Sequence, residues 1–191
     1  MPHVEFYATP EGAEQYSEMA EGYDGREHIP VLRQLVVDGG RVLELGIGPG
    51  TDLELLATYF HVVGSDASQA FLDRYAADHA DADLRLLDAV TIDTDENFDA
   101  IYSNKVLHHL DDAELEASLA RQAQILNPGG VALHGIWKGD SIEDFEGMFV
   151  QNRTCESFMA LAPSTLELIE CSPYAEFDDG DSLRIVVRRV T

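Results

Sequence analysis

The chain has very little positive charge. Its 191 residues include 12 lysines and arginines against 36 aspartates and glutamates, which gives a formal net charge of −24. Lys105 and Lys138 are the two lysines. Binding to a nucleic-acid backbone depends on clustered basic side chains. A chain this acidic, without a basic patch, disfavours DNA or RNA as a partner.

Long apolar runs and cysteine-rich motifs are also missing. No stretch reaches the roughly twenty apolar residues that a membrane-spanning helix needs, so we expect no membrane partner. The first residues lack the basic and then apolar pattern of a secretion signal. Cys155 and Cys171 are too few for a disulfide framework and lack metal-site spacing. We therefore expect two reduced thiols in a cytoplasmic protein.

The most informative stretch is residues 42–50, Val-Leu-Glu-Leu-Gly-Ile-Gly-Pro-Gly. It indicates a buried strand that carries one acid, Glu44, and runs into a tight loop. Glycines let a backbone approach a ligand closely, and a helix that begins directly afterwards directs its free N–H groups at that ligand. A structural turn or another nucleotide fold fits the loop as well. The three glycines are Gly46, Gly48 and Gly50.

Acids end the next two predicted strands as well. The apolar segment 61–65 ends at Asp66, and the segment 84–87 ends at Asp88. Ligands bind at the carboxyl ends of strands in an open α/β sheet, and an acid at the second strand takes the ribose hydroxyls. The alternative role for Asp66 is the N-cap of the helix that follows it.

Acid-x-Gly-x-Gly-x-Gly resembles the first motif of class I methyltransferases, which bind S-adenosylmethionine. Residues 98–110, with the pattern Phe-Asp-x-apolar-x-Ser-x-x-x-Leu-His-His-Leu, resemble the family's fourth strand and the loop after it. Residues 125–133 resemble its helix end, Pro-Gly-Gly turn and fifth strand. The resemblance implies an S-adenosylmethionine-dependent methyltransferase. We expect a small-molecule acceptor and a monomer or homodimer.

The resemblance also implies which residues bind the cofactor. In the family the acid after the third strand accepts a hydrogen bond from the adenine amino group, and the backbone N–H of the next residue contacts the adenine ring. In this chain the matching residues are Asp88 and Ala89. The N-terminal segment covers the cofactor in relatives, where Arg26 would meet the methionine carboxylate. The expected cofactor-binding residues are Glu44, Gly46, Gly48, Gly50, Asp66, Ala67, Asp88, Ala89, Ser103, Tyr23 and Arg26.

The chemistry that the resemblance implies needs few catalytic groups. Methyl transfer from a sulfonium is an in-line displacement with a good leaving group, so positioning supplies most of the catalysis. His108 and His109 are the expected catalytic residues, because they follow the fourth predicted strand and a neutral imidazole can accept a proton. Packing or a hydrogen bond to the backbone is the alternative role for either histidine.

Two other functions stay open. One is a non-catalytic protein that keeps a pocket for S-adenosylmethionine or a nucleotide. The other is an NAD-linked enzyme, but its fingerprint requires a small residue where this chain has Thr51. The spacing of the glycines therefore counts against NAD.

The order of predicted elements indicates a single α/β domain over 1–191. We expect a Rossmann-like doubly wound sheet of seven strands, mostly parallel, with a C-terminal antiparallel hairpin. Helical spacing predicts an N-terminal helical cap within 1–38. Residues 138–163, which include Gly139 and Gly147, are expected to form short helices and a lid. Further helices are predicted over 52–59, 69–80, 113–126 and 164–170, and strands over 174–177 and 183–190.

The charge leads to a prediction about salt. A net charge of −24 with two lysines is typical of a halophilic protein in a salty cytoplasm, and an acidic protein from an ordinary bacterium is the alternative. Self-repulsion destabilises the compact state, and the Debye length falls to about 3 Å at 1 M salt. We expect the melting temperature to rise as KCl increases from about 0.1 to 2 M. A flat or falling melting temperature would refute the halophilic interpretation.

Overall fold

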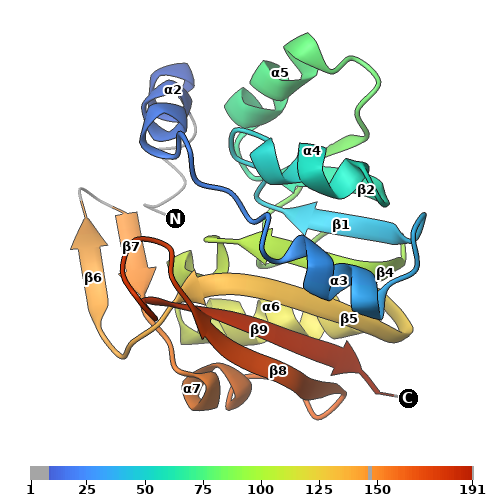
Figure 1. Ribbon diagram of the computed structural model, residues 1–191, viewed down its shortest axis with the longest axis vertical. Helices are drawn as coiled ribbons and strands as arrows, with labels where there is room; N and C mark the ends of the chain where they lie inside the picture. The colour runs from blue at the N-terminus through green and yellow to red at the C-terminus, as the bar shows by residue number, and fades with distance from the viewer. Residues whose placement is uncertain (1–8, 146–147, 191) are drawn as a thin grey trace.

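The computed structural model describes residues 9–145 and 148–190 (Figure 1). One sheet of seven strands crosses the molecule in the order β3-β2-β1-β4-β5-β9-β8. The first five of these pair in parallel, and β9 and β8 are antiparallel. This arrangement confirms the predicted fold class. The strands are β1 (Arg41–Leu45), β2 (His61–Asp66), β3 (Leu84–Leu86), β4 (Phe98–Asn104), β5 (Leu126–Trp137), β8 (Leu166–Tyr174) and β9 (Ser182–Arg189).

Helices cover both faces of the sheet. Alternate residues of β1 enter opposite layers, because successive side chains of a strand point to opposite faces. Leu43 and Leu45 pack with α6, whereas Val42 packs with α3 and α4. The helices are α2 (Pro10–Met19), α3 (Ile29–Leu35), α4 (Thr51–Ala57), α5 (Gln69–Asp78), the 3₁₀ turn η1 (Leu107–His109), α6 (Asp112–Ile125) and α7 (Cys155–Met159).

Local sequence signals explain where several helices begin. Asp111 and Glu114 form a capping box at the start of α6, and such a box satisfies two otherwise unpaired N–H groups. The hydroxyl of Ser68 caps α5 and that of Thr9 caps α2. The three predicted helices between the parallel strands are therefore confirmed within two residues at most of their ends.

The predicted helix over 164–170 is wrong. Residues 164–165 form a turn, and residues 166–170 belong to β8, which runs antiparallel to β9 with Leu168 opposite Val187 and Cys171 opposite Ile185. The Ser-Thr start and the spaced leucines fit a capped helix locally, but the open edge of β9 offers a full ladder of backbone hydrogen bonds. Tertiary pairing overrides such weak local preferences. The expected strand over 174–177 keeps one residue, Tyr174, as the last of β8.

The short helices predicted over 138–163 are largely replaced by strands. β6 (Ile142–Phe145) and β7 (Met148–Gln151) form a separate two-stranded sheet, and α7 follows it. The buried guanidinium of Arg153 fixes the end of this hairpin, with bonds to Asp112 Oδ1 at 2.7 Å and to the carbonyl of Leu110 at 2.9 Å. Gly147 of the predicted lid, and residues 1–8 of the predicted cap, lie outside the described residues.

The expectation of two reduced thiols is also wrong. Cys155 at the start of α7 and Cys171 in β8 are joined by a disulfide, with their Cα atoms 6.2 Å apart. The pair lies 16 residues apart in sequence, and that spacing carries no signal of its own. The fold creates the proximity by packing α7 against the edge of the sheet.

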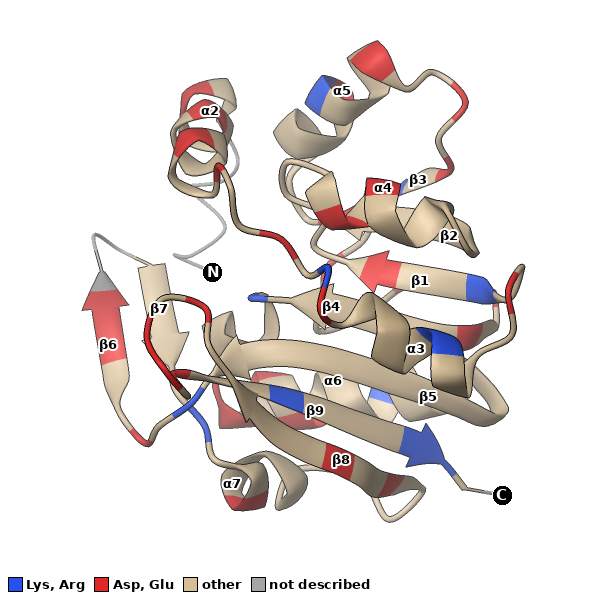
Figure 2. Cartoon of the chain, viewed as in Figure 1, with Lys and Arg blue, Asp and Glu red and all other residues tan. Residues whose placement is uncertain are grey.

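Most of the acidic residues lie on the outside of this fold, whereas Glu44, Asp52 and Asp66 are buried. Figure 2 shows acidic residues on α2, α4, α5, α6 and β6. No helix among the described residues has the length and apolarity that crossing a membrane requires.

Candidate functional site

Two cavities lie at the carboxyl ends of the parallel strands, where an open α/β sheet binds its ligands. The first has a volume of about 120 Å³ and the second about 680 Å³. They share part of their walls, including Gly46, Gly48 and Lys105. Six of the predicted cofactor-binding residues line the first cavity: Gly46, Gly48, Asp66, Ala67, Asp88 and Ala89.

Asp66 connects the two loops that form the first cavity. Its Oδ2 accepts from the backbone N–H of Gly48 at 3.0 Å, and its Oδ1 accepts from that of Ser68 at 2.8 Å. The alternative role as a helix cap does not apply, because Ser68 caps α5. An ionised carboxylate has about four acceptor sites, so Asp66 keeps capacity to bind a further hydroxyl donor.

Buried acids dominate the electrostatics of the site. Burial raises the pKa of Glu44 well above its ordinary value, and the nearby carboxylates of Asp52 and Asp66 raise it further. Burial also raises the pKa of Asp66 and of Asp52, against the lowering effect of their hydrogen bonds. Glu44 lines the second cavity, and its Oε2 has no hydrogen-bond partner among the described residues. The site is therefore suited to a cationic group.

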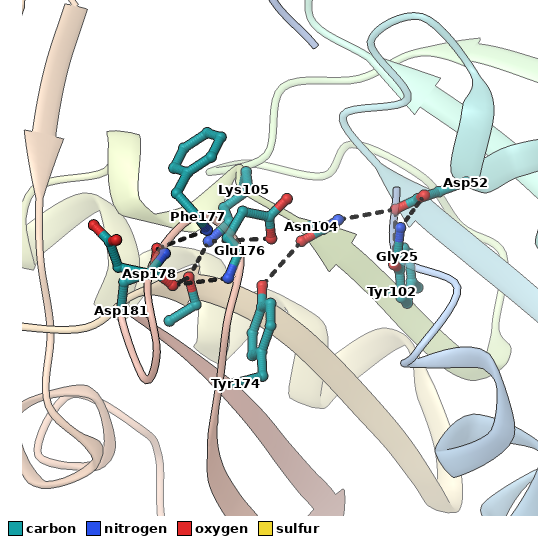
Figure 3. Close-up of polar contacts among 11 residues, drawn as sticks. Gly25, Asp52, Tyr102, Asn104, Lys105, Tyr174, Glu176, Phe177, Asp178 and Asp181 are labelled. Carbon is teal, nitrogen blue, oxygen red and sulfur yellow. Dashed lines mark hydrogen bonds and ion pairs between the residues drawn. The ribbon is translucent and has the colours of Figure 1, made fainter. Parts of the chain in front are cut away.

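The carboxylate of Asp52 holds the N-terminal segment against the sheet (Figure 3). Asp52 accepts from the backbone N–H of Gly25 at 2.6 Å, from the hydroxyl of Tyr102 at 2.7 Å and from Asn104 Nδ2 at 3.2 Å. A Cβ atom at Gly25 would collide with the Tyr102 hydroxyl. This close approach brings α2 and Tyr23 to the mouth of the second cavity.

Three predicted cofactor-binding residues lie elsewhere. Gly50 precedes α4 with a φ of 90°, and a Cβ there would strike the ring of Tyr75, so its place in the loop is a steric requirement. Ser103 is buried and hydrogen-bonded to His134 Nδ1 at 2.8 Å. Arg26 is exposed and paired with Asp24. None of the three is among the residues that line either cavity.

The two predicted catalytic histidines have different surroundings. His108 is buried against Trp137, and burial lowers its pKa well below the ordinary value. His109 lines both cavities. Its Nδ1 lies 2.8 Å from the carbonyl of Phe149 in β7, and a carbonyl can only accept, so Nδ1 carries the proton. His109 thereby joins η1 to the β6–β7 hairpin.

Sequence reasoning missed several residues of the second cavity. Asn104 and Lys105 follow the Ser of the fourth-strand pattern, and Glu176 and Phe177 come from the loop between β8 and β9. Phe177 stacks on Trp137 with ring centroids 5.4 Å apart. Lys105 had a usable signal, since it is one of two lysines and directly follows a predicted strand. Glu176 had none, because its loop reaches the site through the antiparallel pairing.

Comparisons with known proteins agree with this geometry. Residues 42–130 match the family model of the methyltransferase domain. An uncharacterized methyltransferase of Geobacillus kaustophilus is 34% identical over 122 residues, which are 61% of this chain and 54% of that protein. Trans-aconitate 2-methyltransferase of Variovorax paradoxus is 38% identical over 98 residues, which are 49% of this chain and 37% of that protein. The chain thus spans about half the length of these curated relatives, or less.

A solved structure extends the likeness of fold to the whole chain. The Burkholderia thailandensis 1,6-didemethyltoxoflavin-N1-methyltransferase, with its substrate and S-adenosylhomocysteine bound, superposes with a TM-score of 0.80 at 15% identity, covering 100% of this chain and 91% of that one. At this identity the likeness concerns the fold alone.

The buried acid Glu44 generates a prediction for the protein without ligand. Glu44→Gln removes an ionisation that burial disfavours, so we expect a higher melting temperature at neutral pH. Each kcal/mol gained corresponds to about 2–4 °C in a chain of this size. Because the native pKa of Glu44 is raised, the wild type loses stability as the pH rises through that pKa. The advantage of the variant should therefore shrink toward acid pH.

The matched control for this prediction is Glu116→Gln, which changes an exposed acid of α6. Thermal denaturation followed by circular dichroism over a range of pH measures all three proteins. A variant at Glu44 that is no more stable than the wild type at any pH would contradict the prediction.

Proposed function

We propose that the protein transfers a methyl group from S-adenosylmethionine to a small-molecule acceptor. Residues 42–130 match the family model of the methyltransferase domain, and the sheet order fits that fold. The observation that supports this proposal most directly is the junction of Asp66 with the glycine loop at the first cavity. When bound, the cofactor supplies a methyl group on a sulfonium, whose sulfur is the leaving group.

The residues around the first cavity fit the cofactor's parts. Asp66 keeps acceptor sites for the ribose hydroxyls, and the backbone beside Asp88 and Ala89 borders the same space for the adenine ring. Glu44 lines the adjoining second cavity, and its buried Oε2, which has no hydrogen-bond partner among the described residues, suits the ammonium of the methionine end, since a buried charge requires a partner. Arg26 would need to leave Asp24 and turn inward to meet the methionine carboxylate.

The second cavity suits a small acceptor. Its volume of about 680 Å³ lies within the range of about 300–1,000 Å³ that is typical of small-molecule sites. One wall of this cavity is aromatic and consists of Tyr23, Trp137 and Phe177. The rings of Tyr23 and Phe177 meet edge to face, with their centroids 4.7 Å apart. His109 lies between this space and the first cavity. A catalytic role for His108 or His109 stays a prediction.

A thermal-shift comparison tests the proposal. We expect S-adenosylmethionine and S-adenosylhomocysteine to raise the melting temperature, because a ligand that binds only the folded state stabilises it. NAD should have no effect. Equal or greater stabilisation by NAD would contradict the proposal, and methyl transfer to compounds in cell extracts would separate an enzyme from a protein that only binds the cofactor.

We expect Asp66→Ala to weaken binding of S-adenosylhomocysteine at least tenfold. The change removes the acceptor of two ribose hydroxyls, and hydrogen bonds to a charged group contribute about 1.5–3 kcal/mol each. Calorimetry measures the affinity, with the exposed Asp78→Ala of α5 as the matched control. An unchanged affinity in a folded Asp66→Ala protein would assign the carboxylate to loop structure alone.

We propose that the β6–β7 hairpin, within the predicted lid over 138–163, closes over the acceptor. Glu143 of β6 and Met148 and Val150 of β7 line the second cavity, and segments that cover a site exclude water from the reaction. We expect amide exchange in β6 and β7 to be faster than in β1 and β4, and to slow when S-adenosylhomocysteine binds. Protection equal to that of the central strands in both states would make the hairpin a fixed wall.

A further inference from the structure

Lys105 stands at the boundary between the two cavities. It directly follows β4, and it lines both the first and the second cavity. Its backbone has a φ of 57°, a left-handed conformation that costs a non-glycine residue energy and that clusters at functional sites. Its side chain is only 11% exposed. The chain thus holds one of its two lysines in a strained, buried position beside both ligand spaces.

The ammonium of Lys105 has specific partners (Figure 3). Nζ donates to the hydroxyl of Ser182 at 2.6 Å and lies 3.7 Å from Glu176 Oε2. It also lies 3.2 Å from the centre of the Trp137 ring. The Ser182 hydroxyl in turn donates to Asp181 Oδ1 at 2.8 Å. These contacts fix the nitrogen at the wall of the second cavity.

The carboxylates around Lys105 do not fully offset the effect of burial on its pKa. Glu176 and Asp181 from the β8–β9 loop and Glu27 from the N-terminal segment favour the ammonium, but burial outweighs them and lowers the pKa of Lys105 to about 8. The carboxylate of Asp181 is already bound by three backbone N–H groups, those of residues 176–178.

The neighbouring aromatic groups do not supply a countercharge. Burial lowers the pKa of His28 to about 3 and that of His108 well below its ordinary value, so both are neutral near pH 7. The centre of the Tyr174 ring lies 5.2 Å from Nζ. Burial raises the pKa of the Tyr174 hydroxyl beyond the physiological range, so this group is neutral too.

Resting on the proposed function, we propose that Lys105 is a catalytic residue: it faces the sulfonium of the cofactor as a neutral amine and takes the proton that the methyl acceptor loses. Two positive charges at one buried boundary repel each other strongly. The sulfonium cannot lose its charge without reacting, whereas the ammonium can release a proton. The methyl donor therefore selects the form of the protein in which Lys105 is neutral.

The proposed step conserves charge at the site. An acceptor atom that carries a proton attacks the methyl carbon, the carbon–sulfur bond breaks, and its electron pair stays on sulfur. The proton moves from the acceptor atom to Nζ of Lys105. The positive charge that disappears at sulfur reappears on the lysine, where Glu176 and Ser182 hold the ammonium.

Lys105 suits this role better than the predicted histidines. His109 uses the N–H of Nδ1 to hold β7 through the carbonyl of Phe149, and His108 packs against the rings of Trp137 and His109. Lys105 and His109 both border the spaces proposed for the two reactants, whereas His108 lines the second cavity alone. Lys105 differs from both histidines in the partners that hold its ammonium after the transfer, Glu176 and Ser182.

Calorimetry with S-adenosylmethionine and S-adenosylhomocysteine tests the proposal, because the two ligands differ by the methyl group and its charge. Titrations near pH 7 in two buffers of different ionisation enthalpy give the number of protons released on binding. We expect the wild type to release close to one proton more with S-adenosylmethionine than Lys105→Met does. With S-adenosylhomocysteine the two proteins should match. Proton release from the amino groups of the ligands is the same for both proteins, so it cancels when the wild type is compared with Lys105→Met.

The sign of the pH dependence follows from the same coupling. S-adenosylmethionine binds the deprotonated lysine, so its affinity relative to S-adenosylhomocysteine should fall as the pH drops below about 8, by up to about tenfold per pH unit. Lys105→Met should flatten this ratio. In Lys105→Arg the side chain cannot lose its proton, so the affinity for S-adenosylmethionine relative to S-adenosylhomocysteine should be low at every pH. The control is Arg33→Met, at an exposed cation of α3 that lines neither cavity, which should behave as the wild type.

A second measurement needs no variant. Protein labelled with carbon-13 at lysine Cε has two side-chain signals, one from each lysine. We expect the Lys105 signal to titrate at lower pH in the S-adenosylmethionine complex than in the S-adenosylhomocysteine complex, and the Lys138 signal to stay unchanged. Equal titration of Lys105 in both complexes, or equal proton release in wild type and Lys105→Met, would overturn the role of Lys105 and leave the proposed function intact. Failure of both ligands to bind would overturn the proposed function and this inference together.

Discussion

The contact between Asp66 and the backbone N–H of Gly48 is the constraint on which the site depends. It joins the loop after β2 to the glycine loop after β1, and it exists because these two parallel strands pair in register and end at the same edge of the sheet. Parallel pairing thereby turns two separate sequence features into one cavity. The Asp52 carboxylate adds the N-terminal segment to the same edge through Gly25.

The chain keeps carboxylates in this edge at a cost to its own stability. Burial raises the pKa of Glu44, Asp52, Asp66 and Glu176, and it lowers the pKa of Lys105. Such a cluster is poorly compensated without a ligand, since desolvated charges require partners. A ligand with an ammonium and a sulfonium would complete it. The strongly acidic surface is a separate matter, because solvent and salt screen exposed charges.

Particular elements show why the sequence was informative in one half of the chain and not in the other. Between β1 and β5, the strands β1, β2 and β4 are each followed by a helix with its own cap or glycine, so local signals and tertiary structure agree. After Trp137 the local sequence signals and the tertiary structure no longer agree. Residues 166–170 satisfy a helical pattern but pair with β9, and the β6–β7 hairpin replaces expected helices. Cys155 and Cys171 meet because α7 packs beside β8.

The sequence alone determined the fold class, the place of the glycine loop and six residues around the first cavity, because these follow from local backbone requirements and from the order of strands. Only the tertiary structure decided that Gly50 and Ser103 serve packing, that Arg26 is exposed and paired with Asp24, and that Glu176 meets Lys105. The difference is physical: a turn or a cap is encoded by neighbours in the chain. A contact between the β8–β9 loop and the end of β4 depends on antiparallel pairing, which no short segment specifies.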